Sequence, residues 1–374
     1  MVFLDNASTT KCYAGITDIM AKYNTTEFYN PSAPYGKAVE LANEINDAKS
    51  TILKALGGTG KFIFTGSATE SNNTVLLGQL NKRFKKVLVS QGEHSSIHNA
   101  IQAVRNAGFI VEEIPLTKEG TVSIEAFKQL MTKDVGLVSV IHVSNETGAI
   151  NPIKELVNIA KAINPNVLFH SDGVQAFMKI NVNLDDLGVD FYTISGHKIH
   201  APKGIAGLYI RKNLKPFLIG GGQQEGLRGG TENVAGILSL KYAIDNTNIH
   251  ENNVHVSNLR KLLVELLSDV DGVVVNSRME NSPYIVSIGL TDVNGETMVH
   301  ALESDNILVG MGSACSSKSK GNHTLLAMGL SQKEIKGNLR VSFSAENTEE
   351  EIHLFVNKLS ENLIKLKNKI TAKS

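Results

Sequence analysis

Tryptophan is absent from this chain of 374 residues, and cysteine occurs only as Cys12 and Cys315. Two cysteines so far apart, with no Cys-x-x-Cys pair, exclude a disulfide framework and a zinc site, so we predict no metal. The simplest interpretation is a reduced, cytoplasmic protein. A cysteine placed in a suitable loop would then be chemically available.

The chain also has no excess of charge of either sign. Lysine and arginine together number 37, as do aspartate and glutamate, so the formal net charge is zero. This balance gives no electrostatic basis for binding nucleic acid or an anionic membrane surface. No apolar run reaches the roughly 18 residues of a membrane span, and the start, MVFLDNASTT, does not resemble a signal peptide. We therefore expect no direct nucleic-acid or membrane partner.

Short apolar, β-branched runs are plentiful, and amphipathic helical stretches separate them. This alternation predicts a mostly parallel sheet covered by helices on both faces. The pattern extends over residues 14–250, for which we predict a large α/β domain. The seven runs are 61-KFIFTGS, 86-KVLVSQGEH, 109-FIVEEIPL, 136-GLVSVIHVS, 167-VLFHSDG, 190-DFYTISGHK and 206-AGLYIRK.

The alternation of apolar runs and helical stretches ends near residue 250. The stretch 255-HVSNLRKLLVELLSDV predicts a helix, and 273-VVVNS and 284-YIVSIGL predict short strands. Thr348 and Glu351 have capping-box spacing ahead of a run with helical periodicity, which predicts a helix up to the C-terminus. We predict a smaller α+β domain formed by residues 1–13 and 251–374.

Polar residues follow several of the runs directly, at the strand ends where α/β folds bind ligands. Residues 66–69 open a helix with free N–H groups and hydroxyls, which suits a phosphate, although an ordinary N-cap explains them equally well. Asp172 ends a buried run and needs a cationic partner, either a pyridinium nitrogen or an internal ion pair. Lys198 ends another run and could form an imine once desolvated, although a simple turn to solvent gives the same local pattern.

These three features together predict a pyridoxal-phosphate site. His94 would lie flat on the cofactor ring or merely cap its loop, and the local sequence leaves both possibilities open. A nicotinamide-dependent dehydrogenase is a further option for this class of fold. No G-x-G-x-x-G follows an early strand, however, so the sequence does not favour it.

Further motifs stand in order along nearly the whole chain: 4-LDNASTT, 65-TGSATESNN, 93-EH, 145-NETGAINPI, 170-HSDGVQ, 195-SGHKIHAPKGIAGLY, 220-GGGQQEGLRGGTEN, 312-GSACSSKSKGNH and 339-LRVSFSAENTEEEI. In these motifs the sequence resembles the pyridoxal-phosphate-dependent cysteine desulfurases of the iron–sulfur-cluster and nitrogen-fixation type. The resemblance implies a fold-type I transferase architecture with a large domain and a small one.

The resemblance also implies a role for each matching residue. Lys198 would hold the cofactor, His94 would stack on its ring and move protons, and Cys315 would be the nucleophile that takes the sulfur. Asn145 and Arg340 would bind the substrate carboxylate. The other implied cofactor contacts are Ala68, Thr69, Ser195 and His197 at the phosphate, Asp172 at the ring nitrogen, Gln175 at the ring oxygen, and Thr231, which would reach the phosphate of the other protomer in a homodimer.

The implied reaction converts L-cysteine to L-alanine, with the sulfur held as a persulfide on Cys315. An acceptor protein would then take the sulfur for iron–sulfur cluster assembly or tRNA thiolation. Two alternatives remain: a selenocysteine or cysteine lyase that releases selenide or sulfide, and a catalytically quiet scaffold for sulfur-transfer partners. The sequence departs from the family at 30-NPSAPYGKA, which has no histidine after Asn-Pro-Ser, at His200-Ala201 in place of Tyr-Gly, and at Gly229 in place of serine.

Overall fold

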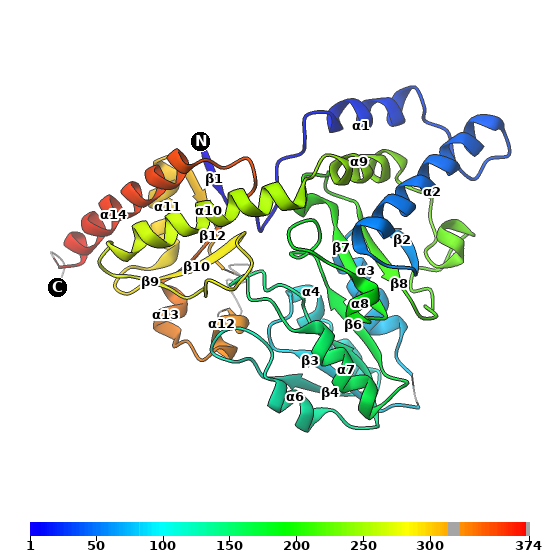
Figure 1. Ribbon diagram of the computed structural model, residues 1–374, viewed down its shortest axis with the longest axis horizontal. Coiled ribbons are helices and arrows are strands. Elements are labelled where there is room, and N and C mark those ends of the chain that lie inside the picture. The colour runs from blue at the N-terminus through cyan, green and yellow to red at the C-terminus, as the bar shows by residue number, and fades with distance from the viewer. Residues whose placement is uncertain (82, 313–321, 372–374) are drawn as a thin grey trace.

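The computed structural model describes residues 1–81, 83–312 and 322–371, with side chains up to residue 368. Figure 1 shows a large sheet with its helices on one side of the molecule and a smaller group of strands and helices on the other. Both chain termini lie in the smaller group. None of the helices in the described ranges is long and apolar enough to cross a membrane.

A seven-stranded sheet forms the centre of the larger part, in the order β2-β8-β7-β6-β5-β3-β4. β8 is antiparallel to both of its neighbours, and the other pairs are parallel. The predicted mostly parallel sheet is confirmed: six of the seven apolar runs contain a whole strand, and the run that begins at residue 136 contains all of β5 except its first residue. The strands are β2 (Lys61–Thr65), β3 (Lys86–Ser90), β4 (Ile110–Ile114), β5 (Val135–Ser139), β6 (Leu168–Asp172), β7 (Phe191–Ser195) and β8 (Ala206–Ile210).

Both faces of this sheet are apolar, because successive side chains of a strand point to opposite faces. In β2, Phe62 and Phe64 join one hydrophobic core, whereas Ile63 between them joins the core on the other face. Helices cover both cores, as expected for a sheet of parallel strands. They are α1 (Ile16–Thr25), α2 (Gly36–Leu56), α3 (Ala68–Gly78), α4 (Ser95–His98), α5 (Ile101–Asn106), α6 (Ile124–Leu130), α7 (Ile153–Ile163), α8 (Leu184–Leu187) and α9 (Val234–Asp245).

The smaller part has its own apolar core, built from residues 2–7 and 256–363. Its strands β12 (Asn338–Ser342), β10 (Ile285–Leu290) and β9 (Val273–Val275) form an antiparallel sheet, and β1 (Val2–Leu4) pairs in parallel with β11 (Ile307–Val309). The predicted capping box is present, because Thr348 Oγ1 accepts from Glu351 N and Glu351 Oε2 accepts from Thr348 N, both at 3.3 Å. The helices are α10 (Ile249–Ser268), α11 (Gly295–Ser304), α12 (His323–Ala327), α13 (Gln332–Lys336) and α14 (Glu349–Thr371).

A buried arginine in the smaller part supports a contact between the two parts. Arg260 of α10 is only 1 % exposed and donates to the carbonyls of Asn281, Ser282 and Arg278. Ser282 N then donates to the carbonyl of Gly148 at 2.8 Å. Arg260 therefore supports the segment that contacts the loop following β5.

Replacing Arg260 should destabilise the fold more than replacing an exposed arginine. We expect Arg260→Met to lower the free energy of unfolding by about 2–4 kcal/mol, because three carbonyls lose a buried donor. Arg278→Met is the matched control, since that side chain is exposed and pairs with Glu119 on the surface, and it should cost less than about 1 kcal/mol. Urea unfolding of both variants measures the difference, and equal losses would contradict this account.

Candidate active site

A cavity of about 930 Å³ opens at the carboxyl ends of the central strands. Residues of the N-terminal segment, the strand ends, residues 310–312 and α12 line it together. Ten of the site residues predicted from the sequence line this cavity: Ala68, Thr69, His94, Asn145, Asp172, Gln175, Ser195, His197, Lys198 and Arg340. Strand ends that are distant in the sequence therefore meet at one edge, as predicted.

Lys198 ends a short 3₁₀ turn, Gly196–Lys198, that follows β7 directly. Its Nζ donates to the carbonyls of Ala7 and Ser8 at 2.7 Å and 2.5 Å. Burial, the largest cause, and the positive charge of Arg340 together lower the pKa of Lys198 to about 8. A larger share of the amine is thus neutral near physiological pH, which is the form that attacks a carbonyl carbon.

Asp172 ends β6 as a carboxylate that is only 2 % exposed. Its Oδ2 accepts from Asn72 Nδ2 at 2.8 Å and its Oδ1 accepts from Val174 N at 3.0 Å. It forms no ion pair with any residue in the described ranges. A buried carboxylate held by neutral donors alone suits a cationic ring nitrogen, whereas the alternative of an internal ion pair does not hold.

His94 reaches Asp172 through a chain of hydrogen bonds. Asn72 Nδ2 also donates to Ser96 Oγ at 2.9 Å, and Ser96 Oγ lies 2.9 Å from His94 Nδ1. Ser96 N donates to the same Nδ1, so the side chain of His94 caps α4 while it lines the cavity. Burial lowers the pKa of His94, and because Nδ1 accepts, the neutral ring carries its proton on Nε2.

The N-terminus of α3 faces the same cavity. Ser67 caps the helix by accepting from Glu70 N at 3.2 Å, and Ser71 N makes the first bond back along the helix, to the carbonyl of Ser67. Helix geometry leaves the N–H groups of Ala68 and Thr69 ahead of that first bond, available to an anion. The helix is therefore capped and also offers donors to the cavity, so the two interpretations of this sequence are compatible.

His197, predicted at the phosphate, also lines the cavity. Its Nδ1 is 3.2 Å from Thr9 Oγ1. Burial is the main reason that its pKa falls to about 4, and the neighbouring charge of Lys198 contributes. His197 is thus neutral at physiological pH, so it can serve a phosphate as a hydrogen-bond donor and not as a cation.

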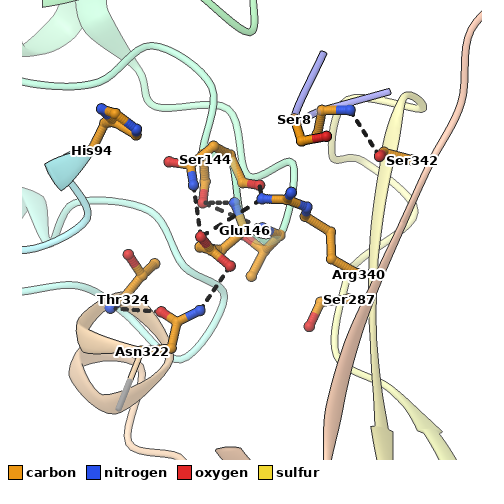
Figure 2. A network of polar contacts seen from close by, with 12 residues as sticks. Ser8, His94, Ser144, Glu146, Ser287, Asn322, Thr324, Arg340 and Ser342 are labelled. Atoms are coloured by element: carbon orange, nitrogen blue, oxygen red, sulfur yellow. Dashed lines mark hydrogen bonds and ion pairs between the residues drawn. The ribbon is translucent and has the colours of Figure 1, made fainter. Parts of the chain in front are cut away.

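Arg340 stands at the opposite wall, where β12 meets the N-terminal segment. Its Nη2 donates to Asp5 Oδ1 and its Nη1 to the carbonyl of Asn145, both at 3.0 Å, and Nη1 lies 3.8 Å from Glu146 Oε1. Figure 2 shows this network. The Nε of Arg340 is buried and has no hydrogen-bond partner in the part of the chain that the structure describes. An unused buried donor on a guanidinium favours an incoming carboxylate.

Two predicted site residues are not placed in the cavity. Thr231 is absent from its lining, and Cys315 lies outside the described residues. The flanking residues Gly312 and His323 both line the cavity. Within the described ranges, no three histidine, cysteine, aspartate or glutamate side chains are grouped to hold a metal ion.

The sequence interpretation also missed several residues of the site. Asn72, Asp5 and Glu146 were quoted only as parts of motifs, without a role, although each bonds directly to a predicted site residue. Glu70 was missed as well: it pairs with Arg228 at 2.8 Å and accepts from Gly66 N, which steadies the start of α3. The position of Asn72 and Glu70 on the helix that follows residues 66–69 was the available signal.

Known proteins share this architecture over nearly its whole length. Residues 2–355 match the model of the aminotransferase class-V family. The chain is 35% identical to cysteine desulfurase IscS 1 of Archaeoglobus fulgidus, with 94% of each chain covered, and 32% identical to cysteine desulfurase NifS of Azotobacter vinelandii, with 98% and 94% covered. A solved NifS-like protein superposes with a TM-score of 0.91 at 32% identity, covering 97% of this chain and 99% of that one.

The chain therefore belongs to the class-V aminotransferases and, within them, to the family of the cysteine desulfurases. Its fold is that of the pyridoxal-phosphate-dependent fold-type I proteins, as the sequence predicted. Pyridoxal phosphate is the cofactor of this family. The cavity fits it on three points already described, namely the unpaired buried carboxylate of Asp172, the free N–H groups at the start of α3 and the partly neutral amine of Lys198.

Two buried histidines beneath the cavity should make the protein sensitive to acid. His170 contacts Ser139 Oγ and Thr193 Oγ1 at 2.9 Å and 3.0 Å, and burial lowers its pKa to about 3 from 6.5. His142 contacts Tyr192, and burial lowers its pKa to about 4. Between these values and pH 6.5 the unfolded chain binds more protons than the folded one, so stability falls as the pH drops through that window.

In the pH range between these pKa values and 6.5, the unfolded wild-type chain binds more protons than the folded one. We expect His170→Gln to make that difference smaller by about one proton. The slope of the unfolding free energy against pH, measured by urea unfolding between pH 6 and 4.5, should become shallower by up to about 1.4 kcal/mol per pH unit. The comparison rests on the slope, which a uniform loss of stability leaves unchanged. The exposed His300 provides the control His300→Gln, which should keep the wild-type slope. An unchanged slope in His170→Gln would refute the assignment.

Proposed function

We propose that this protein converts L-cysteine to L-alanine with pyridoxal phosphate and keeps the sulfur as a persulfide on Cys315. One observation carries the proposal: Lys198, Asp172, the start of α3 and Arg340 converge on a single cavity. An amine, a ring-nitrogen partner, a phosphate site and a carboxylate site are the set of groups that an amino-acid enzyme of this kind needs. The cysteine desulfurase relatives support the choice of substrate.

One group of cavity residues would bind and orient the cofactor. Asp172 would hold a protonated ring nitrogen, while Ala68, Thr69, Ser195, His197 and the homodimer partner's Thr231 would hold the phosphate. Gln175 would reach the ring oxygen; its Nε2 also donates to the carbonyl of Ala7 at 2.9 Å, which fixes the amide. When bound, pyridoxal phosphate supplies an electron sink for bonds at the α-carbon of the substrate.

The residues at the substrate end would position L-cysteine and move protons. Arg340 and Asn145 would bind its carboxylate. Lys198 Nζ, with a pKa near 8, can give and take a proton close to physiological pH, and His94 holds one on Nε2. The thiolate of Cys315 would attack the substrate sulfur, forming the S–S bond as the C–S bond breaks. The electron pair of the broken bond stays with the carbon, which takes up a proton to become alanine.

The proposed function also includes a homodimer, a sulfur acceptor and a division of the chain into two domains. The chain would work as a homodimer in the cytoplasm, and an acceptor protein would receive the sulfur for iron–sulfur cluster assembly or tRNA thiolation. Closed symmetric dimers are the commonest oligomers. We also propose that residues 14–250 form the large domain and that residues 1–13 and 251–374 form the small one, which the separate apolar core of residues 2–7 and 256–363 supports.

Lys198→Ala should fold but lose the covalent attachment of the cofactor and make no alanine above background. The physical reason is that the variant has no amine at the carboxyl end of β7. Borohydride reduction followed by peptide mass spectrometry would locate the lysine that carries the cofactor. Lys203 lines the same cavity, so Lys203→Ala is the control and should retain the attachment. A reducible lysine–cofactor bond in Lys198→Ala would overturn the assignment of Lys198.

Cys315→Ser should bind cofactor and L-cysteine normally yet release no alanine above background. Serine has nearly the volume of cysteine but is a far weaker nucleophile. Cys12→Ser should behave as wild type, because Cys12 is absent from the lining of the cavity and packs against the large core. Mass spectrometry after brief cysteine treatment should find the added sulfur on the peptide with Cys315. Added sulfur on Cys12, or normal alanine production by Cys315→Ser, would rule out the persulfide mechanism.

A further inference from the structure

Glu146 occupies a central place in the cavity wall that neither the sequence motifs nor the reaction accounts for. It lies in the loop after β5 and is only 2 % exposed. Its Oε1 accepts from Asn145 Nδ2 at 2.7 Å and lies 3.8 Å from Arg340 Nη1. Its Oε2 accepts from Asn322 Nδ2 at 2.7 Å. Figure 2 shows the carboxylate with Arg340 on one side and Asn322 on the other.

The Asn322 side of this carboxylate is also held by hydrogen bonds. Asn322 is 5 % exposed, and its Oδ1 accepts from the N–H groups of Thr324 and Leu325 at 3.1 Å and 3.2 Å, which caps α12. With Oδ1 occupied in this way, Nδ2 is the atom that Asn322 presents to Glu146. The orientation of the Asn322 amide is thus fixed by the helix it caps.

Gly312 lies against the same carboxylate oxygen. A Cβ atom at this position would come within 2.7 Å of Glu146 Oε2 and 2.8 Å of Asn322 Nδ2, so the contact leaves no room for a side chain. Gly312 and Asn322 precede and follow, in the sequence, the stretch that contains Cys315. Both ends of that stretch therefore meet at one oxygen of Glu146, while the other oxygen faces the two residues proposed to bind the substrate carboxylate.

We propose that Glu146 is a positioning residue that sets the ends of the Cys315 stretch relative to the substrate-binding pair Asn145 and Arg340. This inference rests on the proposed function, because it gives Cys315 the role of nucleophile. Sulfur transfer requires the thiolate and the substrate sulfur to approach to about 3–3.5 Å, and small errors in that geometry are costly. One oxygen of the Glu146 carboxylate contacts Asn322, and the other lies beside Asn145 and Arg340. Glu146 therefore fixes the end of the Cys315 stretch relative to the residues proposed to bind the substrate.

A carboxylate is required here because only it offers two acceptor oxygens to the donors on its two sides. An amide of the same shape has one acceptor oxygen and one NH₂ group. Since the charge of Arg340 and the amide of Asn145 both favour an oxygen on their side, the NH₂ group of a glutamine would face Asn322. Two donors would then oppose each other at the side that holds the Cys315 stretch.

The central variant is Glu146→Gln, tested in the cofactor-loaded enzyme. We expect KM for L-cysteine to change by less than about threefold, since the Arg340 side is retained. The spectral change on adding L-cysteine should also persist. The single-turnover rate of sulfur transfer to Cys315, followed by mass spectrometry, should fall by about tenfold to a hundredfold. A wild-type transfer rate would overturn the proposal.

A second substitution, at Asn322, should restore the hydrogen bond to residue 146, with the donor and the acceptor exchanged between the two side chains. In Glu146→Gln combined with Asn322→Asp, the introduced aspartate can accept from the glutamine NH₂ group and still cap α12. The double variant has the same net charge as the wild type. It should recover most of the lost transfer rate, whereas Asn322→Asp alone opposes two carboxylates and should be impaired. A double variant no faster than Glu146→Gln would refute the positioning role, since a merely structural effect predicts no rescue.

Further controls separate this inference from the proposed function. Glu119→Gln makes the same chemical change at a surface ion pair and should leave transfer unchanged. Gly312→Ala adds only a methyl group at the contact, so it should slow transfer even if Glu146→Gln does not fold; a wild-type rate would count against the proposal. If the wild type forms alanine without needing Cys315, the proposed function fails. If alanine formation does require Cys315 and the Glu146 variants transfer sulfur at the wild-type rate, only the positioning role fails.

Discussion

Burial of titratable side chains along one edge of the central sheet is the constraint on which the site depends. Removal from water raises the pKa of Glu93 to about 8 and lowers those of His94, His197 and Lys198. Acids and bases are both driven towards their neutral forms, which is typical of functional sites. Asp172 adds a different feature, because its buried side chain is held by neutral donors and suits a cation supplied by a ligand.

Much of this arrangement could be predicted from the sequence, because a sheet covered on both faces leaves a strong pattern. Each apolar run corresponds to a strand, and because parallel strands end at one edge of the sheet, the sequence already places Asp172 and Lys198 close together. The antiparallel direction of β8 was not predictable in this way, since strand direction depends on the connection and not on the apolar run. The helical segment between β3 and β4 is divided into α4 and α5.

The contacts that escaped prediction join residues far apart in the chain. Asp5 and Arg340 have no local pattern that marks them as partners, because their contact depends on how the N-terminal segment packs against β12. The contact of Glu146 with Asn322 depends in the same way on how the loop after β5 packs against the start of α12. Such polar contacts are nevertheless what aligns the two walls of the cavity. Arg340 illustrates the point: the sequence resemblance predicts that it binds a carboxylate, but only its geometry shows that two of its nitrogens are engaged and that Nε has no partner among the described residues.

The departure from the family at His200 has a physical explanation in the same network. His200 stacks on Tyr13 with ring centroids 4.6 Å apart, and its Nδ1 contacts the carbonyl of Lys11 at 2.8 Å. Its backbone N donates to Thr10 Oγ1 at 2.7 Å, which holds the residue at a φ of 66°, a left-handed conformation that costs a non-glycine residue free energy. These contacts fasten the N-terminal segment beside the turn that carries Lys198. The carbonyls of Ala7 and Ser8, just upstream in that segment, are thereby kept at the lysine amine. A residue outside the cavity thus sets the surroundings of the side chain that we propose to hold the cofactor.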